Sequence, residues 1–226
     1  MRGGSPGRLW PKSQRSRARG PRAGAVDRWN SRIERVYKVE GDDRVLPLSG
    51  VPAPDVGAPL PVVLSDEGNL LVAYIAHEPD PNWDGTYVRI VGPGSGGALL
   101  AIVAFERKYC HMFGKPNDEA FHGHPLYARG LRPYSAAEVA ESSWIRAMER
   151  MNSVHPNHQP EHYENFRHFI IAFHDSTFEC IAMGFQVTMH RGSMQSAFAQ
   201  MAKMLCDDWD RTISDCDLDL TMPDGD

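Results

Sequence analysis

Histidine is concentrated in the middle of this chain, where eight of the ten histidines lie between His111 and His174. The imidazole side chain has an unperturbed pKa near neutrality and, in its neutral form, is the commonest metal ligand in proteins. The residues form three groups along the chain: Cys110, His111, His122 and His124; His155, His158 and His162; and His168 and His174, followed by Glu179. This clustering predicts a polar site in the middle of the chain.

His174 and Glu179 are the candidate catalytic pair. The segment Arg167–Val187 has the pattern of a β-hairpin with an Asp-Ser loop, and in that register Glu179 lies opposite Ala172 and diagonal to His174. A carboxylate beside a histidine raises the pKa of the imidazole and fixes its tautomer, as a general base or a metal ligand requires. The alternative is a His–Glu hydrogen bond with a purely structural role.

The first histidine group offers candidate metal ligands. His122 and His124 are separated by one residue and can present two imidazoles to one ion, while Cys110 or His111 adds a third ligand. Such a donor set suits a divalent metal such as zinc in a tetrahedral site. The spacing matches no zinc-finger pattern, so the alternative is that these side chains serve in polar packing.

Two segments resemble known sequence motifs but lack a feature that each motif requires. His158 and His162 are four residues apart, but Pro160 between them excludes the helical metalloprotease motif. The segment Gly92–Gly97 has the spacing of a dinucleotide-binding loop, yet a strand-like apolar run follows it instead of a helix. Neither motif predicts a cofactor.

Several segments must position these side chains. Strands are predicted at Asn69–His77, Thr86–Val91 and Ala98–Glu106, with turn-rich connections typical of an antiparallel meander, and an edge strand at Pro61–Leu64. The hairpin places its apolar residues on one face: Phe169, Ile171, Phe173, Phe178 and Cys180.

Two principal helices are predicted. The first is Ser135–Met151, opened by a capping box between Ser135 and Glu138. The second is Ser193–Trp209, with Ser193 as N-cap and an apolar stripe that includes Met194, Ala197, Phe198 and Met201. The predicted fold is α+β, with a mainly antiparallel sheet of five or six strands and both helices packed on one face.

Charge and composition divide the chain into three parts. Residues 1–35 are rich in Gly, Pro, Arg and Ser and are expected to be a disordered basic segment. Residues 36–209 are expected to form a single domain, and residues 210–226 an acidic tail. The net charge is −5 although the first 28 residues hold eight Lys or Arg and one acid, so the remainder is strongly acidic. This disfavours nucleic acid as a partner.

Two functions from different classes fit these features. The first is a soluble, non-catalytic binding protein of the bacterial cytoplasm, whose acidic surface meets a protein or a small molecule. The second is a metal-dependent or acid–base hydrolase that uses His174 and Glu179 with help from His122 or His124. No apolar run approaches the length of a membrane span. Convergence of the His and Glu side chains into one pocket would favour the hydrolase.

Overall fold

The computed structural model describes residues 38–79 and 92–217, with side chains described as far as Cys206. Tyr37–Asp226 form one unit of the chain and Met1–Val36 the other. The predicted basic segment 1–35 and the predicted strand Thr86–Val91 lie outside the described residues. No helix in the described ranges is long and apolar enough to cross a membrane.

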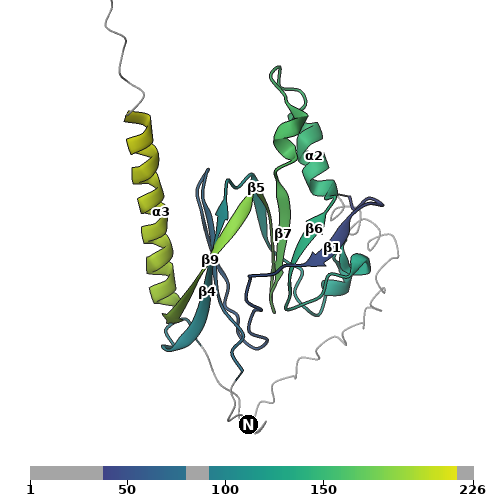
Figure 1. The fold of residues 1–226 in the computed structure, drawn as a ribbon. Coiled ribbons are helices and arrows are strands. Elements are labelled where there is room, and N and C mark those ends of the chain that lie inside the picture. The colour runs from purple at the N-terminus through teal and green to yellow at the C-terminus, as the bar shows by residue number, and fades with distance from the viewer. Residues whose placement is uncertain (1–37, 80–91, 218–226) are drawn as a thin grey trace, which may run out of the picture. The chain divides into compact units, whose positions relative to one another are not determined.

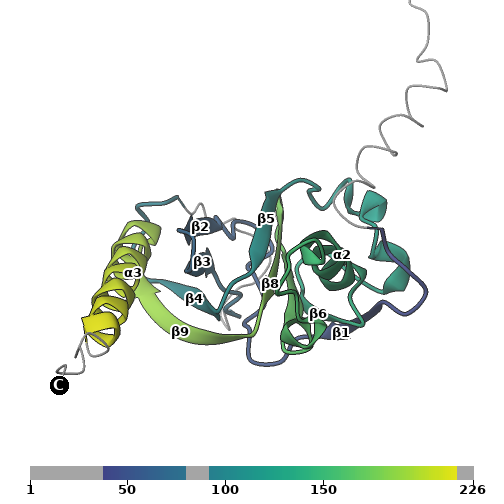
Figure 2. The ribbon, with the colours of Figure 1, turned by 90° about the horizontal axis from the view of Figure 1, so that it is seen from above.

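The strands of the described ranges form two antiparallel sheets (Figures 1 and 2). The five-stranded sheet has, in spatial order, β1 (Arg44–Pro47), β6 (Ala136–Ala140), β7 (Arg167–Ala172), β8 (Thr177–Ala182) and β5 (Cys110–Gly114). The four-stranded sheet has β2 (Val62–Ser65), β3 (Leu70–Ile75), β4 (Ala98–Glu106) and β9 (Gly184–Gly192). The α+β prediction is confirmed, but the strands are divided between two sheets.

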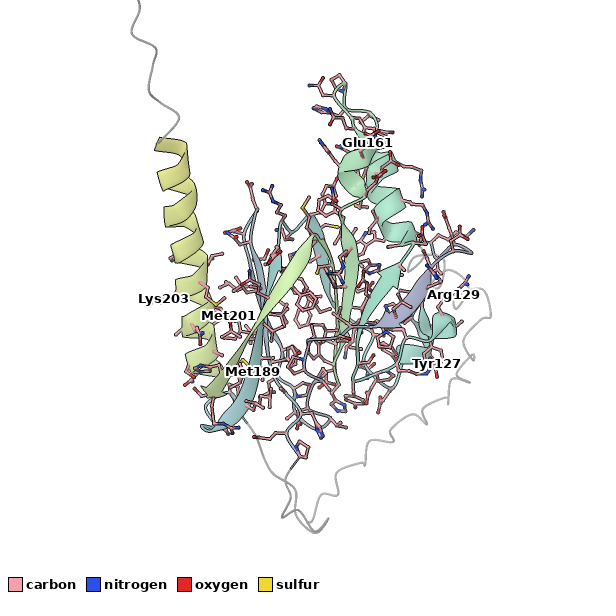
Figure 3. The ribbon with its side chains drawn as sticks, in the orientation of Figure 1. Tyr127, Arg129, Glu161, Met189, Met201 and Lys203 are labelled. Atoms are coloured by element: carbon pink, nitrogen blue, oxygen red, sulfur yellow. The ribbon has the colours of Figure 1, made fainter. Side chains whose placement is uncertain are left out.

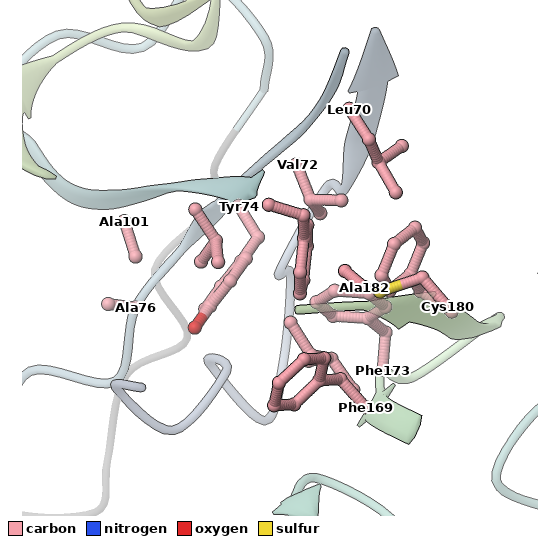
Figure 4. Packing of buried hydrophobic residues seen from close by; sticks show 13 residues of the cluster. Leu70, Val72, Tyr74, Ala76, Ala101, Phe169, Phe173, Cys180 and Ala182 are labelled. Atoms are coloured by element: carbon pink, nitrogen blue, oxygen red, sulfur yellow. The ribbon is translucent and has the colours of Figure 1, made fainter. Parts of the chain in front are cut away.

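The two sheets share a hydrophobic core (Figure 4). Alternate residues of β3, including Leu70, Val72 and Tyr74, pack against Phe169 of β7 and Phe173 just after it. The Tyr74 and Phe173 rings meet edge to face with centroids 5.3 Å apart. Because side chains alternate along a strand, the intervening residues point to the opposite, outer face of each sheet.

Each sheet carries one α-helix on its outer face (Figure 2). Trp144 of α2 (Ser143–Asn152) packs on the five-stranded sheet, and Met201 of α3 (Met194–Asp217) packs on the four-stranded sheet. The layers are therefore helix, sheet, sheet, helix. The two helices lie on opposite outer faces rather than on one face as predicted.

The predicted helix Ser135–Met151 is wrong in its first part, which is strand β6. Ala137 and Val139 are buried while the residues between them are less so, which is the two-residue period of a strand. Glu141 then has a φ of +54°, which no α-helix can contain. Alanine occupies both buried and partly buried positions of this strand and favours helices, so the sequence does not reveal the two-residue period.

Helix α2 begins after Ser142, whose Oγ accepts a hydrogen bond from the backbone N–H of Ile145 at 3.4 Å. Ser142 is thus the N-cap, and the predicted capping box of Ser135 with Glu138 is wrong. Glu138 instead pairs with Arg167 on the neighbouring strand β7.

The hairpin of β7 and β8 exists, but its predicted register is wrong by two residues. Ala172 rather than His174 lies opposite Thr177, so four residues connect the strands instead of two. An even shift leaves every side chain on its predicted face, and the predicted core face is confirmed. The shift does change which side chains are neighbours across the hairpin.

The other predicted elements are close to those observed. Strands β3 and β4 lie within the predicted segments, and β2 is the predicted edge strand displaced by one residue. Ser193 caps α3 by accepting a hydrogen bond from the N–H of Ser196 at 3.1 Å. The helix continues to Asp217, into the predicted acidic tail, and Phe198 of the predicted apolar stripe is 46% exposed.

Candidate functional site

Glu179 lies at the centre of a polar cluster on the outer face of the five-stranded sheet. It stands opposite Ile170 in the pairing of β8 with β7, which brings it to His168 rather than to His174. His168 Nε2 lies 3.0 Å from Glu179 Oε2, and His124 Nε2 lies 3.0 Å from Oε1. The carboxylate is thus held between two imidazoles from different parts of the chain.

The hydrogen bond at the far side of the His124 ring assigns its tautomer. His124 Nδ1 accepts from the backbone N–H of Leu126 at 3.1 Å, so the ring proton is on Nε2 and is donated to Glu179. Ser142 Oγ lies 2.9 Å from His168 Nδ1, on the side of the ring away from the carboxylate. The Nε2 atoms of both rings thus face one carboxylate.

This cluster is closed to solvent. His168 is 0% exposed, Glu179 is 7% exposed, and the ring of Trp144 packs edge-on against His168 at 5.0 Å. Burial by itself would raise the pKa of Glu179, but the hydrogen bonds from His124 and His168 outweigh burial and lower that pKa to about 2. The cluster joins β7, β8 and the N-terminus of α2, and a substrate has no access to it.

His174 belongs to a separate, more exposed cluster. Its Nδ1 lies 3.1 Å from Asp118 Oδ2 and 2.7 Å from the hydroxyl oxygen of Tyr134, and its side chain is 42% exposed. The Tyr134 hydroxyl donates to Asp118, which lowers the pKa of that carboxyl and, together with burial of the ring, raises the pKa of Tyr134 to about 12. The predicted pairing of His174 with Glu179 is wrong because of the shift in register.

The four predicted metal ligands are not brought together. Cys110 and His111 are consecutive on β5 and so point to opposite faces of the sheet. His122 is exposed in the 3₁₀ helix Phe121–Gly123, while His124 is bound to Glu179. Among the described residues, no group of three or more His, Cys, Asp or Glu side chains is placed to hold a metal ion.

Two members of the second histidine group, His158 and His162, line a cavity of about 400 Å³ that the sequence did not predict. The cavity lies between the end of α2, the turn that joins β4 to β5, and the 3₁₀ helix η3 (Pro160–Tyr163), marked by Glu161 in Figure 3. Its walls combine aromatic rings, side-chain amides, two imidazoles and one guanidinium: Arg107, Tyr109, Asn152, Asn157, His158, Gln159, His162, Tyr163, Asn165, Phe166 and Met183.

An aromatic cluster forms the most buried wall of this cavity. The rings of Tyr109 and Tyr163 lie 5.5 Å apart, and that of Phe166 is 5.3 Å from Tyr109. The two tyrosine hydroxyls are hydrogen-bonded at 2.8 Å. Burial and this hydrogen bond raise the pKa of Tyr109 to about 12, so its hydroxyl stays uncharged at neutral pH.

His158 is the lining residue that is tied to α2. Its Nε2 lies 2.7 Å from Oε1 of Glu149 and donates a hydrogen bond to that carboxylate. Its Nδ1 is buried and has no hydrogen-bond partner among the described residues. The contact with Glu149 fixes the ring of His158 in the wall of the cavity.

The cavity was missed because its parts are distant in sequence. The spacing of His158 and His162 resembles only a helical metal-binding motif, while Tyr109 and Arg107 belong to a turn about fifty residues earlier. The run of Asn, His, Pro and Gln after Asn152 was a signal that could have been used, because it is polar without being highly charged.

Comparison with known proteins found no similarity. No protein-family model matches the chain, and neither a curated protein nor a solved structure matches it. The geometry of the two histidine clusters and of the cavity is therefore the basis for a functional proposal.

Proposed function

We propose that this is a non-catalytic binding protein and that its ligand is a small molecule held in the cavity beside His158. One observation carries the proposal: a cavity of about 400 Å³ combines an aromatic wall with the polar side chains of Arg107 and His158. Small-molecule sites combine apolar and aromatic walls with a few placed polar groups, in volumes of roughly 300–1,000 Å³. The cavity meets each of these criteria.

The Glu179 cluster does not support a hydrolase. A general base must reach the proton that it abstracts, and the Glu179 carboxylate is enclosed and already accepts two N–H donors. We interpret it as a structural element, which was the alternative left open by the sequence. A structural role is therefore favoured over catalysis at this position.

The exposed pair of Asp118 and His174 supports acid–base hydrolysis as a second candidate function. Asp118 faces Nδ1, which leaves Nε2 of a partly exposed ring available as a base. The test is hydrolysis of p-nitrophenyl acetate by the wild type, His174→Gln and His122→Gln. Loss of activity only in His174→Gln would support this function; equal activity in all three proteins would exclude it.

The binding proposal is tested with a blocked cavity. Asn152 lines the cavity at the end of α2, whereas its neighbour Met151 is 63% exposed and does not line it. Asn152→Trp should fill the cavity, and Met151→Trp is the matched control. Ligand-observed NMR with anionic, cationic and neutral fragments should give hits for the wild type and the control that Asn152→Trp loses. No hits, or hits that all three proteins share, would contradict the proposal.

The proposed location is the cytoplasm, because free thiols such as those of Cys110 and Cys180 remain reduced there. A protein partner at the acidic surface stays a prediction from the sequence. Fractionation and a pull-down with the Asn152→Trp variant would separate a protein partner from the small-molecule site.

A further inference from the structure

We propose that the ligand of this cavity is a planar aromatic carboxylate of one or two rings, bound as an anion. This inference rests on the proposed binding function and specifies its ligand class. The ionisable nitrogen groups at the cavity are those of Arg107, His158 and His162, and no Asp or Glu from the described residues lines it. In a chain with a net charge of −5, a cavity wall without carboxylates favours an anion.

Arg107 supplies the permanent positive charge. It lies at the turn after β4 with a φ of +47°, a left-handed conformation that a non-glycine residue adopts at a cost. Among the described residues, no carboxylate lies within ion-pair distance of its guanidinium. An exposed guanidinium with free donors can bind a carboxylate through two parallel hydrogen bonds.

His158 is a second polar group in the same wall. Glu149 holds its ring through the contact of 2.7 Å between Oε1 and Nε2, so the imidazole has a fixed place in the cavity. A fixed polar ring adds to the attraction that Arg107 exerts on a carboxylate.

The aromatic wall accounts for the rest of the ligand. Tyr109, Tyr163 and Phe166 contact one another and present ring surface and edges rather than flexible aliphatic chains. Flat rings pack on such a wall in offset or edge-to-face geometry, with little loss of side-chain entropy. A cavity of about 400 Å³ accepts one or two rings with their carboxylate.

The test compares four probes that differ in one property each. These are 2-naphthoate, the neutral 2-naphthamide, the cationic 2-naphthylmethylammonium and the saturated decahydronaphthalene-2-carboxylate. Calorimetric titration of the wild type should show 2-naphthoate binding about tenfold tighter than the amide and the ammonium probe, the size expected for a charge-assisted hydrogen bond. It should also bind several-fold tighter than the saturated acid, which lacks the aromatic contacts with the wall. Asn152→Trp should abolish binding of 2-naphthoate, which locates it in the cavity.

Two variants test the residues. Arg107→Gln and His158→Gln should each reduce the preference for carboxylate over amide, while His155→Gln should leave it unchanged. His155 is the matched control because it is exposed in the same segment, bonds the backbone N–H of Asn157 and does not line the cavity. Circular dichroism of each variant establishes that it is folded before the affinities are compared.

The outcomes separate the two proposals. If the amide or the cation binds in the cavity as tightly as 2-naphthoate, or if 2-naphthoate fails to bind while other fragments still bind there, the carboxylate class is wrong and the binding function stands. If the saturated acid binds equally well, the requirement for a planar ring is wrong. If no fragment of any class is displaced by the Asn152→Trp substitution, the binding function itself is wrong.

Discussion

At the scale of single residues, the Glu179 carboxylate links two distant segments of the chain, because it is hydrogen-bonded to both His124 and His168. Glu179→Gln would replace a carboxylate that accepts from His124 and His168 with an amide whose NH₂ group must face one of those two donors. We expect a loss of about 3 kcal/mol in the free energy of unfolding, because a buried donor loses its acceptor.

Urea denaturation at pH 7 measures this loss. Glu67→Gln is the control, because Glu67 is exposed and far from the cluster in sequence. A Glu179→Gln protein as stable as the control would contradict the structural role of the cluster.

The pKa of Glu179 also predicts a dependence of stability on pH. This pKa is lowered from 4.5 to about 2 in the folded protein, where burial is outweighed by the His124 and His168 hydrogen bonds. As the pH falls, Glu179 is therefore protonated in the unfolded chain before it is protonated in the folded protein. The stabilisation present above pH 4.5 is lost as the pH falls toward 2, and the loss in the free energy of unfolding is on the order of 3 kcal/mol. Urea midpoints between pH 7 and pH 3 should fall less steeply for Glu179→Gln than for the wild type; parallel curves would contradict this assignment.

The sequence identified Glu179 and His124 as functional candidates but not as partners. Their side chains are 55 residues apart, and no periodicity relates a loop histidine to a strand carboxylate at that distance. His168 was on the correct face of the predicted hairpin, yet the two-residue loop made His174 the neighbour. The choice between a two-residue and a four-residue loop depends on local turn energies that an Asp-Ser pair does not decide.

At the scale of elements, helix α2 is fixed by residues outside it. Asp43 is buried and accepts hydrogen bonds at 2.6 Å from both the backbone N–H and the hydroxyl of Ser143 at the start of the helix. A negative charge at a helix N-terminus is favourable, because it meets unpaired N–H groups and the positive end of the helix dipole. The contact links the segment before β1 to a helix 100 residues later.

Asp43→Asn should therefore lower the free energy of unfolding by about 2 kcal/mol. Thermal denaturation compares it with Asp42→Asn, whose neighbouring carboxylate is exposed. Equal melting temperatures for the two variants would show that the Asp43 contact contributes nothing to stability. Because α2 carries Glu149 and Asn152, the Asp43 variant also tests whether the cavity depends on this helix end.

Helices and strands could be predicted from the sequence where one hydrophobic period dominates a segment. Strand β4 consists of eight apolar residues and Glu106, and its predicted bounds are confirmed, as is Ser193 as the cap of α3. The segment that became β6 and α2 was not, because a short alanine-rich strand resembles the first turns of a helix.

At the scale of the whole described unit, stability depends on the core between the two sheets. Phe169 is fully buried there and contacts the rings of Phe105 and Phe185 from the opposite sheet. Phe169→Ala should cost about 3–5 kcal/mol, since it removes a large side chain and leaves a void between the sheets.

The control is Phe113→Ala, because Phe113 is 45% exposed on the edge strand β5. Urea denaturation followed by tryptophan fluorescence and by circular dichroism should give coincident transitions for Phe169→Ala. Two separate transitions would show that the sheets unfold independently. The sequence could not predict this pairing of sheets, because alternating patterns specify faces but not which strands become neighbours.

The position of β9 has a consequence for the order in which the molecule is made. Its partner β4 is complete long before β9 (Gly184–Gly192) leaves the ribosome, and four of the five strands of the other sheet, β5 to β8, are translated in the interval. The nascent chain can therefore assemble the histidine-rich layer and its cavity first. The edge of β4 that pairs with β9 stays unpaired until β9 is synthesised, and pairing between strands so distant in sequence is slow to form. Translation pauses after β8 would prolong that exposure.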